Sequence, residues 1–221
     1  MESVSYSDLL VYAFIDPAGG KRQQLKRVRA RSAIVVVGAD YMERLFVLHT
    51  WADRASTPQI LEKVFAINER FKPRRFGCEA NALQSLFADA IRYIAKERGL
   101  RIPLTPVEQP TKITKEFRVR SILQPIIGNG RLFLQPNQHE LRTEITAFPT
   151  GLTVDLVDAL ASVAAMVPPI SKHALEARAD IDLHQYLIDS GLGEDEIALT
   201  VADLEREDGN ASVVGGHYRS T

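Results

Sequence analysis

The spacing of apolar positions predicts strands and helices in alternation along the first three quarters of the chain. Apolar runs joined by short connections predict three consecutive strands, at residues 9–16, 32–38 and 44–51. Strands that follow one another through short links pair as hairpins, so we expect these three to form an antiparallel meander.

Beyond the meander the pattern changes to the period of an α-helix. Further strands are predicted at 75–79 and 102–107, with a short edge strand at 131–134. Helices are predicted at 57–72, 81–98, 112–123, 138–147 and 154–167. This order predicts an α/β domain whose central mixed sheet of five strands combines the meander with parallel strands and is flanked by helices.

The segment after residue 169 differs in composition from the rest. Pro168 and Pro169 end the last apolar helix, and the residues that follow are polar and rich in Asp and Glu. We therefore predict a folded domain at 1–169 and an acidic C-terminal tail at 170–221 that is partly helical or disordered.

The composition excludes several classes of protein. The single cysteine, Cys78, excludes a disulfide framework within the chain. The longest apolar stretch, 156–170, is interrupted by Asp158 and is shorter than the roughly 20 residues that a membrane span needs. We therefore expect a cytoplasmic protein without a membrane partner.

Basic side chains are concentrated in two segments, although 27 basic and 28 acidic residues nearly cancel over the chain. Residues 21–31 carry six basic side chains and no acid, and residues 112–120 carry four with one acid. Such clusters are typical of contacts with DNA phosphates, and equally of a solvated helix face or a charged strand edge. The candidate DNA-binding residues are Lys26, Arg27, Lys112, Lys115, Arg118 and Arg120.

Carboxylates stand at two predicted strand ends and near one helix start. Asp16 closes the first strand, and Glu79 closes the strand at 75–79. Asp155 and Asp158 lie three residues apart near the start of the last apolar helix, so they share a helix face. One such carboxylate alone is typical of a turn or of a helix start, where it complements the dipole. Together they favour a metal site.

Carboxylate oxygens are the ligands that Mg²⁺ and Mn²⁺ prefer in proteins. Two such ions about 3.5–4 Å apart activate a water molecule and stabilise the leaving oxygen in phosphodiester hydrolysis. The acids therefore indicate a hydrolase that uses two Mg²⁺ or Mn²⁺ ions. Its catalytic metal ligands are Asp16, Glu79 and an acid of the last helix, Asp155 or Asp158.

Four stretches of the chain resemble the nuclease domain of tailed-phage terminase large subunits. They are FIDPAGG, RFKPRRFGCEANALQ, TKITKEFRVRSILQPIIGNGRLFL and FPTGLTVDLVDALA. The resemblance covers about residues 8–167 and implies an RNase H-like fold, with Asp16 and Glu79 as the first two catalytic acids. In the family's last motif two consecutive acids are usual; here Val154 replaces the first, so the third ligand is Asp155, which we favour, or Asp158.

The resemblance implies a metal-dependent DNA endonuclease that cuts concatemeric viral DNA during genome packaging, in the host cell cytoplasm. Double-stranded DNA is then the substrate, and the terminase ATPase, the small terminase subunit and the portal are the implied protein partners. No Walker A pattern, GxxxxGK[ST], occurs in the chain, so we expect an isolated domain or a separately encoded nuclease. Two alternatives stay open: another RNase H-like nuclease, such as a Holliday-junction resolvase or a transposase-like enzyme, and a non-catalytic docking module of the packaging machinery.

Overall fold

The computed structural model describes residues 4, 6–17, 31–80, 82–108 and 113–169. Three of the predicted DNA-binding residues, Lys26, Arg27 and Lys112, lie outside the described residues, as does the predicted tail at 170–221. The domain boundary after residue 169 therefore stays a prediction.

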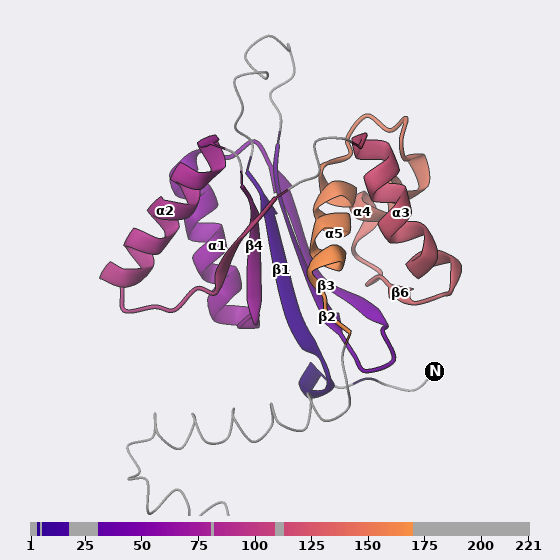
Figure 1. Ribbon diagram of the computed structural model, residues 1–221, viewed down its shortest axis with the longest axis horizontal. Coiled ribbons are helices and arrows are strands. Elements are labelled where there is room, and N and C mark those ends of the chain that lie inside the picture. Colours follow the sequence, from indigo (N-terminus) through magenta and orange to yellow (C-terminus); the bar gives the residue numbers. More distant parts are fainter. Residues whose placement is uncertain (1–3, 5, 18–30, 81, 109–112, 170–221) are drawn as a thin grey trace, which may run out of the picture. The chain divides into compact units, whose positions relative to one another are not determined.

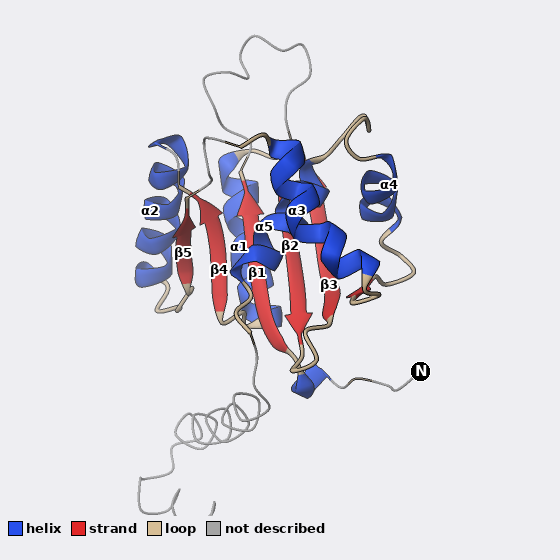
Figure 2. Ribbon diagram, turned by 45° about the vertical axis from the view of Figure 1, so that its right-hand side comes forward, coloured by secondary structure: helices blue, strands red, loops and turns tan. Residues whose placement is uncertain are grey.

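A six-stranded mixed sheet forms the centre of the described structure (Figure 2). Its strands are β1 (Leu10–Asp16), β2 (Ser32–Ala39), β3 (Leu45–Asp53), β4 (Arg75–Glu79), β5 (Leu104–Val107) and β6 (Leu132–Phe133). They lie in the order β5-β4-β1-β2-β3-β6. β1, β2 and β3 pair antiparallel, whereas β4 is parallel to β1, β5 to β4 and β6 to β3. The predicted α/β class, with an antiparallel meander extended by parallel strands and flanked by helices, is confirmed, and the predicted edge strand adds a sixth strand.

Helices cover both faces of this sheet. They are α1 (Thr57–Phe71), α2 (Ala82–Glu97), α3 (Lys115–Gly128), α4 (His139–Ala147) and α5 (Asp155–Met166), with a short 3₁₀ helix at Tyr6–Asp8. α1 and α2 lie on one face, and α5 lies on the other with α3 and α4 beside it (Figure 1). Because both faces are covered, every residue of β2 is buried. None of the helices in the described residues is both long and apolar enough to cross a membrane.

The bounds of α3 differ from the predicted 112–123, for local reasons. The helix begins after Thr114, whose hydroxyl accepts a hydrogen bond from the Phe117 N–H at 3.2 Å and so caps the first turn. It also continues past Pro125, which lacks an N–H but keeps its carbonyl. That carbonyl accepts from the Asn129 N–H at 3.1 Å, which completes the last turn.

Alternation along β1 and β4 decides which side chains face α5. The core beneath α1 and α2 contains alternate residues of these strands, namely Val11, Ala13, Ile15, Phe76 and Cys78. The residues between them face α5. Asp16 follows Ile15, and Glu79 follows Cys78, so both acids lie on the α5 face while the cysteine fills the opposite core.

Gly77 allows α5 to approach the sheet closely. A Cβ atom at this position would lie 2.3 Å from the Met166 sulfur, at the end of α5, and 2.6 Å from the ring of Phe14. Real Cβ atoms do not come this close to their neighbours, so any larger residue must displace one of these side chains or the helix.

We expect Gly77→Ala to lower the free energy of unfolding by about 1–3 kcal/mol, because an overpacked core forces its neighbours to move. Urea unfolding measures the change. Gly128→Ala is the matched control, since a Cβ there meets no atom within 4 Å, and it should change stability by at most about 1 kcal/mol. Equal midpoints for the Gly77 variant and the wild type would show that α5 adjusts without cost.

Candidate active site

Two acidic side chains lie side by side at the ends of β1 and β4. The parallel register pairs Phe14 with Gly77 and Ile15 with Cys78. One step further along this register Asp16 stands beside Glu79, and both face α5. The structure therefore brings together the first two predicted metal ligands.

The start of α5 adds further carboxylates to this place. The pKa of Asp16 rises from 3.8 to about 7, mainly because the carboxyl is desolvated by burial. Repulsion from three neighbouring carboxylates adds to the rise, and these belong to Glu79, Asp158 and Asp155. The Lys115 ammonium acts in the opposite direction and lowers the Asp16 pKa. The four predicted acids thus share one electrostatic environment.

Asp158 is held by two cations of α3. The side chain is buried; its Oδ2 accepts from Lys115 Nζ at 2.7 Å, and its Oδ1 accepts from the Arg118 guanidinium. Arg118 also donates to the Ser162 hydroxyl at 3.0 Å, one turn further along α5. A lysine in the first turn of a helix interacts unfavourably with the helix dipole. The ion pair with Asp158 offsets this cost and so accounts for the position of Lys115. This cluster joins α3 to α5.

Arg31, directly before β2, links Asp155 to α4. Its Nε donates to Asp155 Oδ2 at 3.2 Å, its Nη2 donates to Glu144 Oε1 at 3.0 Å, and its Nη1 pairs with Glu140. Desolvation works against the charge of Arg31. Hydrogen bonds to Glu140 and Asp155 outweigh it, so the pKa of the guanidinium is raised and the cation is maintained.

Sequence reasoning does not identify Arg31 or Glu144 as part of the site. Arg31 counts only as one of six basic residues in the segment 21–31. The spacing of Glu140 and Glu144 could have indicated a role for Glu144, because residues four apart share one helix face and can bind the same cation. The spacing does not identify that cation, since Arg31 is more than a hundred residues away along the chain.

The predicted DNA-binding side chains of α3 fall into two groups. Arg118 has only 11% of its side chain exposed and is committed to Asp158, so it offers little surface to a DNA backbone. Lys115 is 45% exposed although it also contacts Asp158. Arg120 lies on the surface, where it pairs with Glu116 at 3.1 Å. The exposed cations of this helix are therefore the better candidates for phosphate contacts.

The chemistry of the acids fits a hard divalent cation. All four supply carboxylate oxygens. Burial is the main cause of the raised Asp16 pKa, and the neighbouring carboxylates that add to it form a negative environment that a cation offsets. Among the residues that the structure describes, no group of three or more His, Cys, Asp or Glu side chains is already gathered closely enough to hold an ion. The positive charges now contacting Asp155 and Asp158 are Arg31, Lys115 and Arg118.

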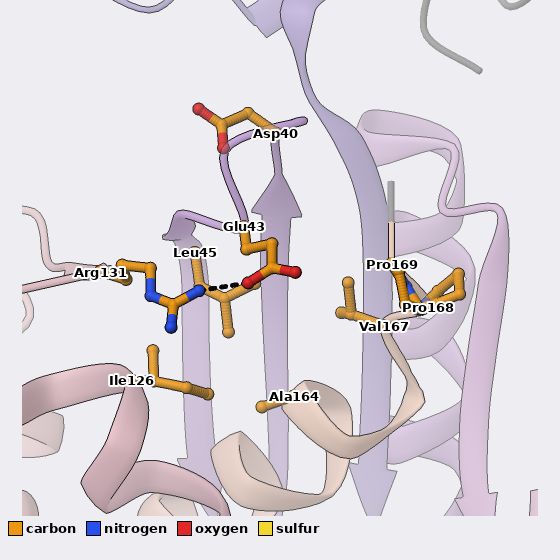
Figure 3. Close-up of a pocket in the computed structure, with 9 residues that line it drawn as sticks. All are labelled: Asp40, Glu43, Leu45, Ile126, Arg131, Ala164, Val167, Pro168 and Pro169. Atoms are coloured by element: carbon orange, nitrogen blue, oxygen red, sulfur yellow. Dashed lines mark hydrogen bonds and ion pairs between the residues drawn. The ribbon is translucent and has the colours of Figure 1, made fainter. Parts of the chain in front are cut away.

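The four acids line neither of two cavities in the described structure. One, of about 250 Å³, is lined by Asp40, directly after β2, and by the end of α5, with the ion pair of Glu43 and Arg131 beside it (Figure 3). Since β2 runs antiparallel to β1, this is the end of the sheet away from Asp16. The other, of about 350 Å³, lies between α3 and α4 and reaches Val157 in the first turn of α5. The first cavity is therefore remote from the candidate site, whereas the second borders the helix that carries two of its acids.

Comparisons with known proteins give only a distant likeness. No family model matches the sequence, and no curated protein is similar to it. Thermus thermophilus RuvC in complex with a Holliday junction substrate is 17% identical, over 76% of this chain and 96% of that one, with a TM-score of 0.41. The P22 large terminase nuclease domain is 13% identical, over 73% and 81%, with a TM-score of 0.46. The fowlpox virus Holliday junction resolvase is 10% identical, over 71% and 95%, with a TM-score of 0.44. Values this low carry no argument about activity.

The raised pKa predicts that ionisation of Asp16 weakens the fold. The folded chain keeps the Asp16 proton up to about pH 7, whereas the unfolded chain releases it near pH 3.8. The folded state therefore binds more protons between these values, and the stabilisation present below about pH 4 is lost as the pH rises through 7. We expect Asp16→Asn to raise the Tm at pH 8 by about 5 °C, with a smaller difference at pH 5.

Scanning calorimetry in EDTA at the two pH values measures this effect. Asp89→Asn is the matched control, because Asp89 lies on the exposed surface of α2 and should give the same small change at both pH values. A Tm difference for Asp16→Asn that does not depend on pH contradicts the assignment.

Proposed function

We propose that this protein is a metal-dependent DNA endonuclease with an RNase H-like fold. The observation that carries the proposal is the convergence of Asp16, Glu79, Asp155 and Asp158 at one end of the sheet, which helps to raise the Asp16 pKa to about 7. Carboxylates placed near one another against their own repulsion are typical of functional sites, because such an arrangement costs stability.

Asp16, Glu79 and Asp155 are the proposed ligands of two Mg²⁺ or Mn²⁺ ions. When bound, such ions supply an activated water and stabilise the leaving oxygen of a phosphodiester. The chain's own contribution is to hold deprotonated carboxylates on two strands and one helix start. Asp16 must lose its proton to take part, so binding of the ions should strengthen as the pH rises through about 7.

We assign Asp158 a bracing role between α3 and α5 rather than the place of third ligand. Both of its oxygens are already engaged, by Lys115 and by Arg118. Asp155 contacts Arg31 through Oδ2, and its side chain is more exposed than that of Asp158. The contacts therefore support the choice of Asp155.

Double-stranded DNA is the proposed substrate. Lys115 and Arg120 lie on the helix that borders the acids. Lys26, Arg27 and Lys112, outside the described residues, remain candidates from the sequence. Phosphate contacts of this kind carry no base code, so binding should be sensitive to salt and weakly sequence-dependent. The finer assignment, cutting of concatemeric viral DNA together with a terminase ATPase, a small subunit and a portal, is supported by the four sequence stretches alone.

The first test is nicking of supercoiled plasmid with Mn²⁺ and with EDTA. Asp16→Asn and Glu79→Gln keep the shape of each side chain but remove its charge. We expect each variant to lose at least about 100-fold in rate, since even residues that only support metal ligands cost about 10–100-fold. Asp89→Asn, on the exposed face of α2, should cleave as the wild type does.

Other substrates separate the remaining functions. A four-way junction and a linear duplex of the same sequence are compared under the same conditions. Strong preference for the junction would support a resolvase in place of a packaging nuclease. A folded protein that cleaves none of the substrates with either metal would support a docking module.

Asp158→Asn and Asp155→Asn should fail in different ways. The Asp158 variant leaves the Arg118 guanidinium largely buried without its counter-charge, so we expect a loss of about 2–4 kcal/mol in the free energy of unfolding. The Asp155 variant should lose cleavage with a smaller loss of stability. Urea unfolding and plasmid nicking together check this. If the Asp158 variant is stable but inactive and the Asp155 variant cleaves, Asp158 is the third ligand.

A further inference from the structure

We propose that Glu144 of α4 is a positioning residue that holds the Asp155 carboxylate in place for a divalent cation, acting through Arg31 and through the first turn of α5. This inference rests on the proposed function, in which Asp155 is a metal ligand. Glu144 itself contacts neither the ion nor DNA in this proposal.

Glu144 is buried in a way that a surface acid is not. Only 2% of it is exposed, and both of its carboxylate oxygens are used. Oε1 accepts from Arg31 Nη2 at 3.0 Å, and Oε2 accepts from the backbone N–H of Val157 at 3.0 Å. A buried carboxylate is expensive unless it is paired and hydrogen-bonded, so these two contacts account for its presence.

The contact with Val157 replaces a missing helix cap. Val154 occupies the N-cap position of α5, and a valine side chain cannot accept a hydrogen bond from the first turn. The Glu144 carboxylate supplies that acceptor from a different helix, and its negative charge also suits the positive end of the helix dipole. Since Asp155 is the first residue of α5, the anchor fixes the backbone from which its carboxylate extends.

The contact with Arg31 fixes the other end of Asp155. One planar guanidinium binds Glu144 Oε1 through Nη2 and Asp155 Oδ2 through Nε. The rigid fork of an arginine defines the relative positions of its two acceptors, which a flexible lysine would not do. Glu144 therefore determines the place of Asp155 both through the helix backbone and through the carboxylate oxygen. Carboxylate ligands of metals are commonly held by such outer hydrogen bonds.

The chain provides a matched control on the same helix. Glu140 pairs with the same guanidinium, through Nη1, but it is 51% exposed and the structure gives it no contact with α5. Glu140→Gln and Glu144→Gln remove the same charge from the same cation, one turn apart on α4. Only Glu144→Gln changes the residue that also binds the first turn of α5.

The test is isothermal titration calorimetry of the full chain with Mn²⁺ in the absence of DNA, at pH 8. We expect Glu144→Gln to weaken Mn²⁺ binding by about 10–100-fold, the range for residues that support metal ligands. Glu140→Gln should stay within about two-fold of the wild type. Circular dichroism and the Tm show whether each variant is folded at the temperature of the titration.

Arg31→Gln keeps the inference testable if the Glu144 variant does not fold. A positioning role predicts weaker Mn²⁺ binding in this variant, because Asp155 loses its hold. If Arg31 only repels the ion, the same change strengthens binding, so the sign of the effect decides. In the Glu144→Gln, Arg31→Gln double variant, the losses should be less than additive, since the part of the Glu144 effect that passes through Arg31 is already lost in Arg31→Gln.

The outcomes distinguish this inference from the proposed function. A wild-type chain that binds no Mn²⁺, or an Asp16→Asn variant that binds it as well as the wild type does, contradicts the metal site itself. Normal Mn²⁺ binding in the wild type together with unchanged affinity in a folded Glu144→Gln variant overturns the positioning role alone. Equal losses in the Glu140 and Glu144 variants would also overturn it, because they would reflect charge and not position.

Discussion

The burial of Asp16 beside three other carboxylates at one end of the sheet governs how the surrounding elements are arranged. Burial and neighbouring negative charge together move the Asp16 pKa to about 7. The fold tolerates this because cations from two other segments enter the same region: Arg31 before β2, and Lys115 with Arg118 on α3. Ion pairs therefore contribute to the packing of α3 against α5.

These cations stabilise the chain and at the same time set conditions on the proposed activity. Each of them contacts a carboxylate on α5, so a divalent ion at this site must share or replace existing partners. Asp158 has both oxygens engaged and is removed from solvent, which suits a structural pair. Asp155 contacts Arg31 through one oxygen. Its carboxylate can therefore bind an ion while Arg31 keeps it oriented, as outer hydrogen bonds do for other carboxylate ligands. The two acids are therefore proposed to have different roles, because Asp158 contacts two cations and Asp155 contacts one.

The scaffold reaches this arrangement through two close approaches. Gly77 removes the side chain that would otherwise keep α5 away from β4, and the Glu144 carboxylate anchors the first turn of the same helix. One contact lies toward the end of α5 and the other at its start, so the helix is fixed along its length over the sheet. Asp155 is the first residue of α5, so its position depends on these two contacts, although neither involves a proposed metal ligand directly.

Local sequence patterns were sufficient to predict the elements of the fold and to single out four candidate acids. Short apolar runs and apolar stripes of helical period are local properties, so β1 to β6 and the five helices of the described residues follow from them, and Asp16 and Glu79 stand out because each closes a buried strand. The bounds of α3 followed less well, since they depend on one hydroxyl cap and on the tolerance of a proline near the helix end.

The pairing of cations with acids follows from the assembled fold and not from any local pattern. Arg31 and Glu144 are 113 positions apart, and no local pattern states that a guanidinium before β2 reaches a carboxylate on α4. The same holds for Arg118, which looks like a DNA-binding residue in the sequence and is turned inward to Asp158 once α3 packs on α5. Pairing between distant side chains depends on strand register and helix packing, and these are properties of the assembled chain.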